Sequence, residues 1–245
     1  MRYKMLIEYD GTAFFGWQKQ DGQLSVQEVL EKALSVALRK PVELFCCGRT
    51  DTGVHALGQV AHFDTEEPLD CRKVLASVNA LVRPHLVAVH QIEPVNEDFH
   101  ARFSAVQRTY VYQIQNTVYP PVLKKDKVAH VALPLDETLM NQAAQVLIGK
   151  HDFSTFRASG CQAQSPIKTL DTIRVWREEE MVFIQVQARS FLYHQVRNIV
   201  GSLILVGLHK WTPDKFEQVF LSCDRTQAGP TAPACGLYFK EVSYK

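Results

Sequence analysis

The sequence predicts an α+β fold made of two related units with a mainly antiparallel sheet, and three observations support this class. Apolar residues in the first half follow the order βαββαβ, which is the ferredoxin-like order. A similar order starts again at Val106, with insertions. The chain has 245 residues, of which 46% are hydrophobic and 22% are charged, a balance typical of a globular protein with a substantial core.

The repeated pattern predicts the domain organisation. We expect one unit over residues 1–98 and a second over residues 106–245, joined near 99–105. Helices would lie on one side of the sheet, and a central active-site cleft would lie between the two halves.

Local signals place the elements of the first unit. Ser25-x-x-Glu28 is a capping box that opens a helix, and Pro41 closes that helical region. Pro84 stops the next helix, because proline cannot continue one. The expected strands are 3–9, 42–47, 58–63 and 86–92, and the expected helices are 26–38 and 70–82.

The second unit shows similar signals. The acidic turn Glu178-Glu179-Glu180 separates two extended segments and predicts a hairpin. Thr212 as a cap, with Pro213 in the first turn, predicts the start of a short helix. The expected elements are a strand over 106–115, a helix over 136–148, hairpin strands over 169–177 and 181–188, a long helix from near Phe191, the short helix from Pro213, and a strand over 236–244.

The charge balance excludes bulk basicity as a means of binding nucleic acid. The chain has 27 Lys plus Arg against 26 Asp plus Glu, so a polyanionic partner must be met by a local basic patch. An ordinary solvated surface is the alternative for each basic residue. The candidate contacts are Arg102, Arg108, Lys124, Lys125, Lys127, Arg157, Lys168, Arg174 and Arg189.

The cysteines and the apolar segments indicate the compartment. The six cysteines form no C-x-x-C pair, so we expect reduced thiols in the cytoplasm. Acidic residues come too early for a secretory leader. The most apolar stretch, 191–208, contains Arg197 and other polar residues that a bilayer would have to desolvate, so no membrane segment is expected.

Residues 47–56, Cys-Gly-Arg-Thr-Asp-Thr-Gly-Val-His-Ala, form the most informative segment. Two glycines bracket a cation, two hydroxyls and a carboxylate directly after a strand, where loops present functional groups on a rigid scaffold. Spacing alone leaves two interpretations open. The segment is either a functional loop or a polar loop in which Asp51 caps a turn and Arg49 forms a surface ion pair.

The motif Gly48-Arg49-Thr50-Asp51-x-Gly53-Val54-His55 resembles the signature of the tRNA pseudouridine synthase A family. One departure is Thr52, where the family commonly has Ala, and this threonine adds a hydroxyl beside the aspartate. Further similar motifs occur in the same order along essentially the whole chain, at 8–11, 15–18, 25–28, 98–105, 108–112, 152–157 and 191–201.

The resemblance implies a pseudouridine synthase fold and an enzyme that converts uridine to pseudouridine at positions 38, 39 and 40 of the anticodon stem-loop of tRNA. Uracil is cleaved from C1′ of its ribose, turned, and rejoined through C5, so no cofactor is expected. The Asp of the motif is the family's essential carboxylate, which makes Asp51 the catalytic candidate. A carboxylate can add as a nucleophile or take a proton from the sugar, and both routes stay open.

The resemblance also implies three further site residues. Arg197 is the cation expected to keep Asp51 ionised. Arg49 is expected to hold the flipped nucleotide through phosphate hydrogen bonds and stacking. Tyr110 matches the family's base-stacking tyrosine, whereas Tyr112 is assigned to the core.

Partners follow from the same resemblance. We expect tRNA as the substrate and a homodimer as the assembly, because family members act as homodimers in which one protomer helps to position the tRNA for the other. A dimer would also roughly double the basic surface available to the RNA.

Other functions remain to be compared with this one. A non-catalytic RNA-binding module stays an alternative, and it predicts that Asp51→Ala leaves every activity intact. A zinc deaminase is excluded, because His55-Ala56-Leu57 is not H-x-E and no C-x-x-C follows. No motif supplies the second acid of a glycosidase. We expect a structural role for His55 and no metal site, because the other histidines lack ligand spacing.

Overall fold

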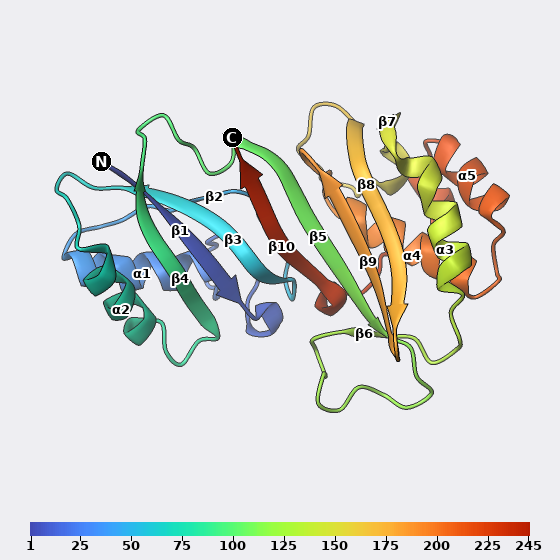
Figure 1. The fold of residues 1–245 in the computed structure, drawn as a ribbon, viewed down its shortest axis with the longest axis horizontal. Helices are drawn as coiled ribbons and strands as arrows, with labels where there is room; N and C mark the ends of the chain where they lie inside the picture. The colour runs from blue at the N-terminus through green and yellow to red at the C-terminus, as the bar shows by residue number, and fades with distance from the viewer. The chain divides into compact units, whose positions relative to one another are not determined.

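The computed structural model describes residues 1–245 and confirms the α+β class. The chain forms two units (Figure 1), and each has its own internal contacts. Unit 1 comprises Met1–Val106 and Tyr238–Lys245, and unit 2 comprises Gln107–Leu237. Most strand pairs are antiparallel, as predicted.

Unit 1 is built around β1 (Arg2–Tyr9), which pairs antiparallel with both β3 (His55–Asp64) and β4 (Val87–Val95). The short strand β2 (Phe45–Cys46) pairs with one end of β3, and β10 (Leu237–Tyr244) pairs in parallel with the other end. Side chains of β1 alternate between the core and the open face. Those buried in the core are Tyr3, Met5, Ile7 and Tyr9.

The two helices of unit 1 start where the sequence predicts. Helix α1 (Val26–Leu38) is capped by the Ser25 hydroxyl, which accepts from the Glu28 amide at 3.2 Å, and α2 (Cys71–Leu81) is capped by Asp70. The helices pack against each other, and α2 also packs on β4. A 3₁₀ turn, η1 (Gly11–Ala13), precedes α1. The element order of this part of the chain, β1-α1-β2-β3-α2-β4, confirms the predicted βαββαβ order.

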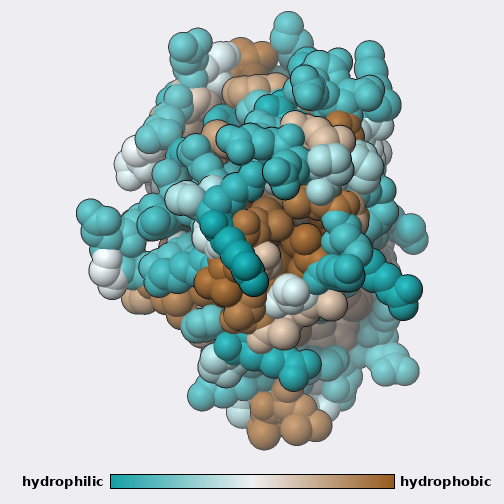
Figure 2. All heavy atoms as spheres, turned by 90° about the vertical axis from the view of Figure 1, so that its left-hand side faces the viewer, coloured by the Kyte–Doolittle hydropathy of each residue, from teal (hydrophilic) through white to brown (hydrophobic).

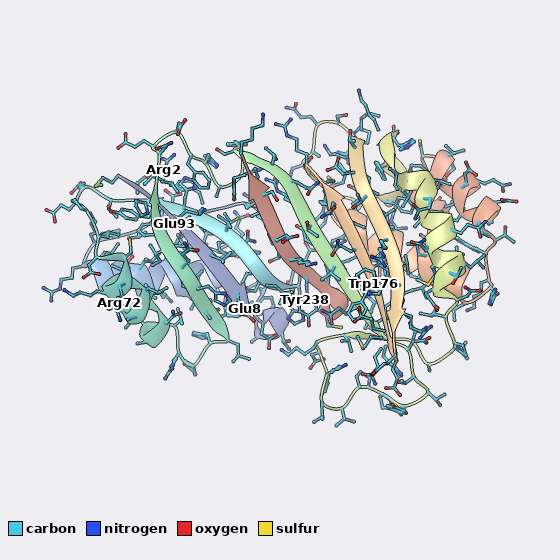
Figure 3. The ribbon with its side chains drawn as sticks, in the orientation of Figure 1. Arg2, Glu8, Arg72, Glu93, Trp176 and Tyr238 are labelled. Carbon is cyan, nitrogen blue, oxygen red and sulfur yellow. The ribbon has the colours of Figure 1, made fainter.

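The open face of the β1 and β4 strands is polar, so helices cover this part of the sheet on one side. Arg2 and Glu8 of β1 and Glu93 of β4 are labelled in Figure 3. Arg2 pairs with Asp64 at 2.7 Å, and Lys4 pairs with Glu93 at 2.6 Å. Figure 2 shows the end of the molecule at the left of Figure 1, where hydrophobic residues gather within a hydrophilic surround.

The strands of unit 2 lie in the order β5 (Ala105–Gln115), β9 (Met181–Ala188), β8 (Ile167–Glu178) and β7 (Gly149–Asp152). A two-residue strand, β6 (Ala129–His130), pairs in parallel with β5. Strands β8 and β9 form the predicted hairpin, and Glu179 occupies the turn with φ 51°.

Helix α3 (Glu137–Ala144) packs on β8 and contacts the other two helices of unit 2, α4 (Gln195–Gly207) and α5 (Pro213–Leu221). Thr212 caps α5 and Pro213 is its first residue, as predicted. No helix is both long and apolar enough to span a bilayer. The remaining 3₁₀ turns are η2 (Gln145–Leu147), η3 (Ser154–Phe156), η4 (Arg225–Gln227) and η5 (Ala234–Gly236).

The structure corrects two predicted element boundaries. Helix α4 begins at Gln195 rather than near Phe191, because His194 has φ 58° and the Gln195 side chain accepts from the Leu192 amide. The strand predicted over 42–47 is reduced to β2, because α1 side chains bind the Val42 and Leu44 amides.

The last strand differs from the predicted organisation, in which all of 106–245 formed the second unit. Its residues from Tyr238 onward belong to unit 1 by their contacts. The predicted active-site cleft stays a prediction.

Candidate functional site

Asp51 lies in the loop 47–54, which connects β2 to β3. Its side chain is half-buried, and its carbonyl accepts a hydrogen bond from the Val54 amide at 3.1 Å. Gly53 has φ 77°, a value that favours glycine at this turn. The loop therefore presents a carboxylate on a closed and defined turn rather than on an extended surface segment.

Thr50 anchors the inner side of this loop. Its hydroxyl lies 2.7 Å from the Tyr9 hydroxyl, and its carbonyl accepts from the Trp17 amide at 3.0 Å. Tyr9 and Trp17 are both buried. Burial raises the pKa of Tyr9 well above its usual range, so its hydroxyl stays neutral and available for this hydrogen bond.

Two glycines let the segment after β1 lie directly against the loop. Gly16 has φ 88°, and a Cβ there would lie 2.5 Å from the Thr50 carbonyl oxygen and 3.2 Å from the Asp51 carbonyl carbon. At Gly11 a Cβ would lie 2.0 Å from the Val54 carbonyl oxygen. Only glycine permits these backbone contacts, so both positions help to fix Asp51.

His55 contributes to the structure of the same region. It is buried, the Gly11 amide donates to its Nδ1 at 3.0 Å, and the Asp10 carboxylate lies 3.1 Å from that nitrogen. Its ring stacks on Tyr238 of β10 at 4.7 Å, a residue labelled in Figure 3. These contacts agree with the expected backbone-holding role of His55.

Several residues that hold the loop have no role predicted from the sequence. Tyr9, Gly16 and Trp17 were part of motifs similar to the family, but nothing in the sequence showed that they contact the aspartate loop. Gln59 was not singled out, although it is buried and donates to the Gly48 carbonyl at 2.7 Å. A buried glutamine on a central strand was the available signal, because it needs a hydrogen-bond partner.

Arg49 is exposed and makes no ion pair. The alternative in which it forms a surface salt bridge is therefore not supported by the structure. The neighbouring Thr52 is also exposed.

Arg197 lies in the first turn of α4 in unit 2 and is half-buried. Its Nε donates to the Ala232 carbonyl at 2.8 Å, and its own carbonyl accepts from the Ala232 amide at 3.1 Å. Its Nη1 lies 3.3 Å from Nε2 of His194. The planar guanidinium is thus fixed in direction by the segment that follows η4.

That segment is bound to α4 by a polar network. The Thr231 hydroxyl donates to Oδ1 of Asn198 at 2.6 Å, and Arg225 donates to both side chains at 3.1 Å. The backbones also approach closely, since a Cβ at Gly201 would lie 1.7 Å from the Pro230 carbonyl oxygen.

Tyr110 lies on β5 opposite Val186 of β9 and is half-buried. Its ring meets that of Phe191 edge-on, with centroids 5.1 Å apart and an interplanar angle of 87°. Tyr112 is fully buried and donates to the Pro233 carbonyl at 2.7 Å, which confirms its assignment to the core. Of the two tyrosines, only Tyr110 keeps part of its ring accessible.

Comparison with known proteins identifies the family. A family model described as tRNA pseudouridine synthase matches residues 5–104 and 143–245. A relative from Rhodospirillum rubrum, described as tRNA pseudouridine synthase A, is 48% identical over 244 residues, which are 100% of this chain and 88% of the relative. The chain belongs to the tRNA pseudouridine synthase family.

Two further relatives with the same description support this family assignment. One from Rhodospirillum centenum is 51% identical over 243 residues, covering 99% of both chains. One from Paramagnetospirillum magneticum is 52% identical over 243 residues, covering 99% of this chain and 95% of the relative. The chain is thus an enzyme of the isomerase class.

Within this pseudouridine synthase family match, the matched ranges include Arg49, Asp51 and Arg197, whereas Tyr110 lies between them. No group of three or more His, Cys, Asp or Glu side chains is arranged to hold a metal. None of the six cysteines is in a disulfide.

The structure separates the basic residues that were candidate RNA contacts. Arg108 is buried and donates to the Arg189 carbonyl, which indicates a structural role. Arg157 donates to the carbonyls of Cys161 and Ala163, at 3.0 and 2.7 Å. The candidates that are exposed are Arg102, Lys124, Lys125, Arg174 and Arg189.

Proposed function

We propose that this chain isomerises uridine to pseudouridine in tRNA, at positions 38, 39 and 40 of the anticodon stem-loop. The observation that carries the proposal is the loop around Asp51, which joins a half-buried carboxylate to a backbone fixed by buried side chains and glycines. Membership in the tRNA pseudouridine synthase family supplies the reaction class.

Asp51 is the proposed catalytic carboxylate. The bond between C1′ and N1 breaks, uracil turns, C5 joins C1′, and the proton released from C5 is balanced by one gained at N1. Asp51 either adds to the nucleotide as a nucleophile or removes a proton from the sugar, and both roles need the ionised form. A half-buried position suits them, because the carboxylate is accessible yet partly shielded from water.

Three further residues are proposed to act on the same uridine. Arg197 would keep Asp51 ionised, and its Nε bond to Ala232 supports this role by orienting the guanidinium. Arg49, exposed beside the aspartate, would hold the flipped nucleotide by its phosphate. Tyr110 would stack on the extruded base, supported by the edge-on packing of Phe191 that holds its ring.

The direct test replaces Asp51 by asparagine, which keeps the size of the side chain and removes its charge. We expect the rate of pseudouridine formation in unmodified tRNA to fall by about 10²–10⁴-fold, as is usual for the loss of a positioned acid-base group. Carbodiimide adducts located by primer extension would report both the product and its position.

The matched control is Asp214→Asn, because Asp214 is an exposed aspartate in the first turn of α5. It should retain full activity. Normal product formation by Asp51→Asn would refute the role of the carboxylate. If the wild-type protein binds RNA normally but forms no product, the non-catalytic alternative would be favoured. Product at other uridines would refute the choice of positions 38, 39 and 40 alone.

The proposed setting is a homodimer in the cytoplasm that needs no cofactor. Six cysteines outside any disulfide support a reducing compartment. A net charge of +1 supports a dimer, since two copies would present more basic surface to one tRNA. Sedimentation equilibrium would give the mass, and a monomer that retains full activity would refute the dimer.

A further inference from the structure

A set of four rings in unit 1 lies outside the site already described. We call it the ring ladder, and it consists of Phe45, His62, His100 and Phe103. Ring centroids are 5.1 Å apart between Phe45 and His62, 4.7 Å between His62 and His100, and 4.4 Å between His100 and Phe103. Its two ends reach the surface, because Phe103 is 70% exposed and Phe45 is 39% exposed.

The backbone fixes the two histidines of the ladder in their neutral form. The Ala101 amide donates to Nδ1 of His62 at 3.2 Å, and the Arg102 amide donates to Nδ1 of His100 at 3.1 Å. Burial lowers the pKa of His62 to about 4, and burial also lowers the pKa of His100. At neutral pH the ladder is therefore an uncharged aromatic surface on a rigid support.

Positive charge lies beside this surface. The Arg102 guanidinium is 5.5 Å from the centroid of the Phe103 ring, and its side chain is exposed. Phe45, at the other end of the ladder, belongs to β2, the strand that leads into the loop carrying Asp51.

Two nearby acidic groups have cationic partners of their own. Asp64 pairs with Arg2 at 2.7 Å, and Glu97 lies 3.8 Å from the N-terminal amine. The exposed end of the ladder thus combines a large aromatic face with an arginine. This is the combination that binds single-stranded nucleic acid, since bases stack on the ring and phosphate pairs with the cation.

We propose that Phe103 and Arg102 form a binding surface for an unpaired nucleotide of the RNA substrate, separate from the nucleotide that reacts at Asp51. The base stacks on the exposed Phe103 ring, and the adjacent phosphate binds Arg102. His100 and Phe45 support the platform from behind. The proposal rests on the proposed function for its choice of RNA, and it adds a second point of contact that holds the strand beside the aspartate loop.

The test compares Phe103→Ala with Phe103→Tyr, using unmodified tRNA. Loss of one stacking contact should raise the Kd and the KM about 5- to 150-fold, with kcat little changed, because the contact is remote from the reacting atoms. Phe103→Tyr keeps the aromatic ring and should bind the tRNA with the same Kd as the wild-type protein. Leu86→Ala is the control, since Leu86 is 66% exposed in unit 1 and lies outside the ladder.

Arg102→Gln tests the phosphate contact independently. It should lower the slope of log Kd against log salt by about 1, whereas Phe103→Ala should leave the slope unchanged. Both variants should keep the melting temperature of the unmodified chain, because the two side chains are exposed.

The outcomes separate this proposal from the proposed function. If the unmodified chain forms pseudouridine but Phe103→Ala has normal Kd and KM, the platform is refuted and the enzyme assignment stands. If Phe103→Ala weakens RNA binding but the unmodified chain forms no product, the platform stands and the reaction is refuted. A change in oligomeric mass for Phe103→Ala would show that a second copy covers the ring, and would also overturn the proposal.

Discussion

The two charged residues proposed for catalysis are held in different ways. The loop that carries Asp51 is held through Thr50 and through its main chain, by buried residues such as Tyr9 and by the close approach of Gly16. Arg197 is held through its own guanidinium, which donates to Ala232, and through its own carbonyl.

This difference predicts how each region responds to substitution. A loop positioned through its backbone can shift without unfolding the core, so damage there should alter catalysis more than stability. Helix α4 is itself part of the core, with Ile199, Val200 and Leu203 fully buried. Damage to its contacts with residues 229–232 should therefore reduce both stability and activity.

Gly201→Ala should give the largest effect of the variants that test this comparison. Its Cβ would lie 1.7 Å from the Pro230 carbonyl oxygen, and a backbone atom cannot move aside as a side-chain end can. We expect the free energy of unfolding to fall by about 3 kcal/mol and product formation to fall with it. Urea unfolding followed by tryptophan fluorescence would measure the first quantity.

Gly207→Ala is the matched control in the same helix. Its Cβ would meet Sδ of Met140 at 2.6 Å, a flexible side chain that can move, and alanine favours the helix by about 1 kcal/mol. The net change should be below about 1 kcal/mol. Equal destabilisation by the two alanines would contradict the special closeness of α4 to residues 229–232.

Gly16→Ala should act mainly on catalysis. Position 16 has φ 88°, and a Cβ there would lie 2.5 Å from the Thr50 carbonyl oxygen, so the loop carrying Asp51 must shift. A displacement of about 1 Å can cost about 10²-fold in rate, and we expect a fall of that order in kcat. Single-turnover assays would measure it.

Gly22→Ala is the control for backbone strain. Gly22 also has a positive φ, 73°, but a Cβ there would have nothing within 4 Å. The Gly22→Ala variant should lose about as much free energy of unfolding as Gly16→Ala and keep the kcat of the wild-type protein. If both variants lose activity equally, strain rather than contact with the aspartate loop explains the effect.

Much of the fold could be predicted from local signals. The capping box at Ser25, the Thr212-Pro213 start and the hairpin around Glu179 each depend on near neighbours in the chain, and the structure confirms all three. The start of α4 was wrong, because it depends on a side-chain bond from Gln195 and a positive φ at His194 that apolar periodicity does not reveal.

The candidate site followed a similar rule. Asp51 was identified from a contiguous motif, but its supports at Gly16 and Gln59 are brought to it only by folding. The network of Arg225 and Thr231 behind Arg197 was also missed. These two residues lie 27 and 33 positions beyond their partner Asn198 in the chain and carry no motif of their own. Polar contacts between residues far apart in the chain cannot be predicted from one sequence, because only the fold brings those residues together.

Thr231→Val should give the smallest effect and test the network that holds Arg197. It removes the hydroxyl that donates to Asn198 at 2.6 Å, and we expect a loss of about 1 kcal/mol in stability. Because Thr231 precedes Ala232, kcat should also fall about fivefold with KM unchanged. Thr231→Ser should restore kcat, and Thr226→Val should be neutral, since that hydroxyl bonds only the exposed Asp224. A lower stability with unchanged kcat would mean that the network stabilises the fold without orienting the arginine.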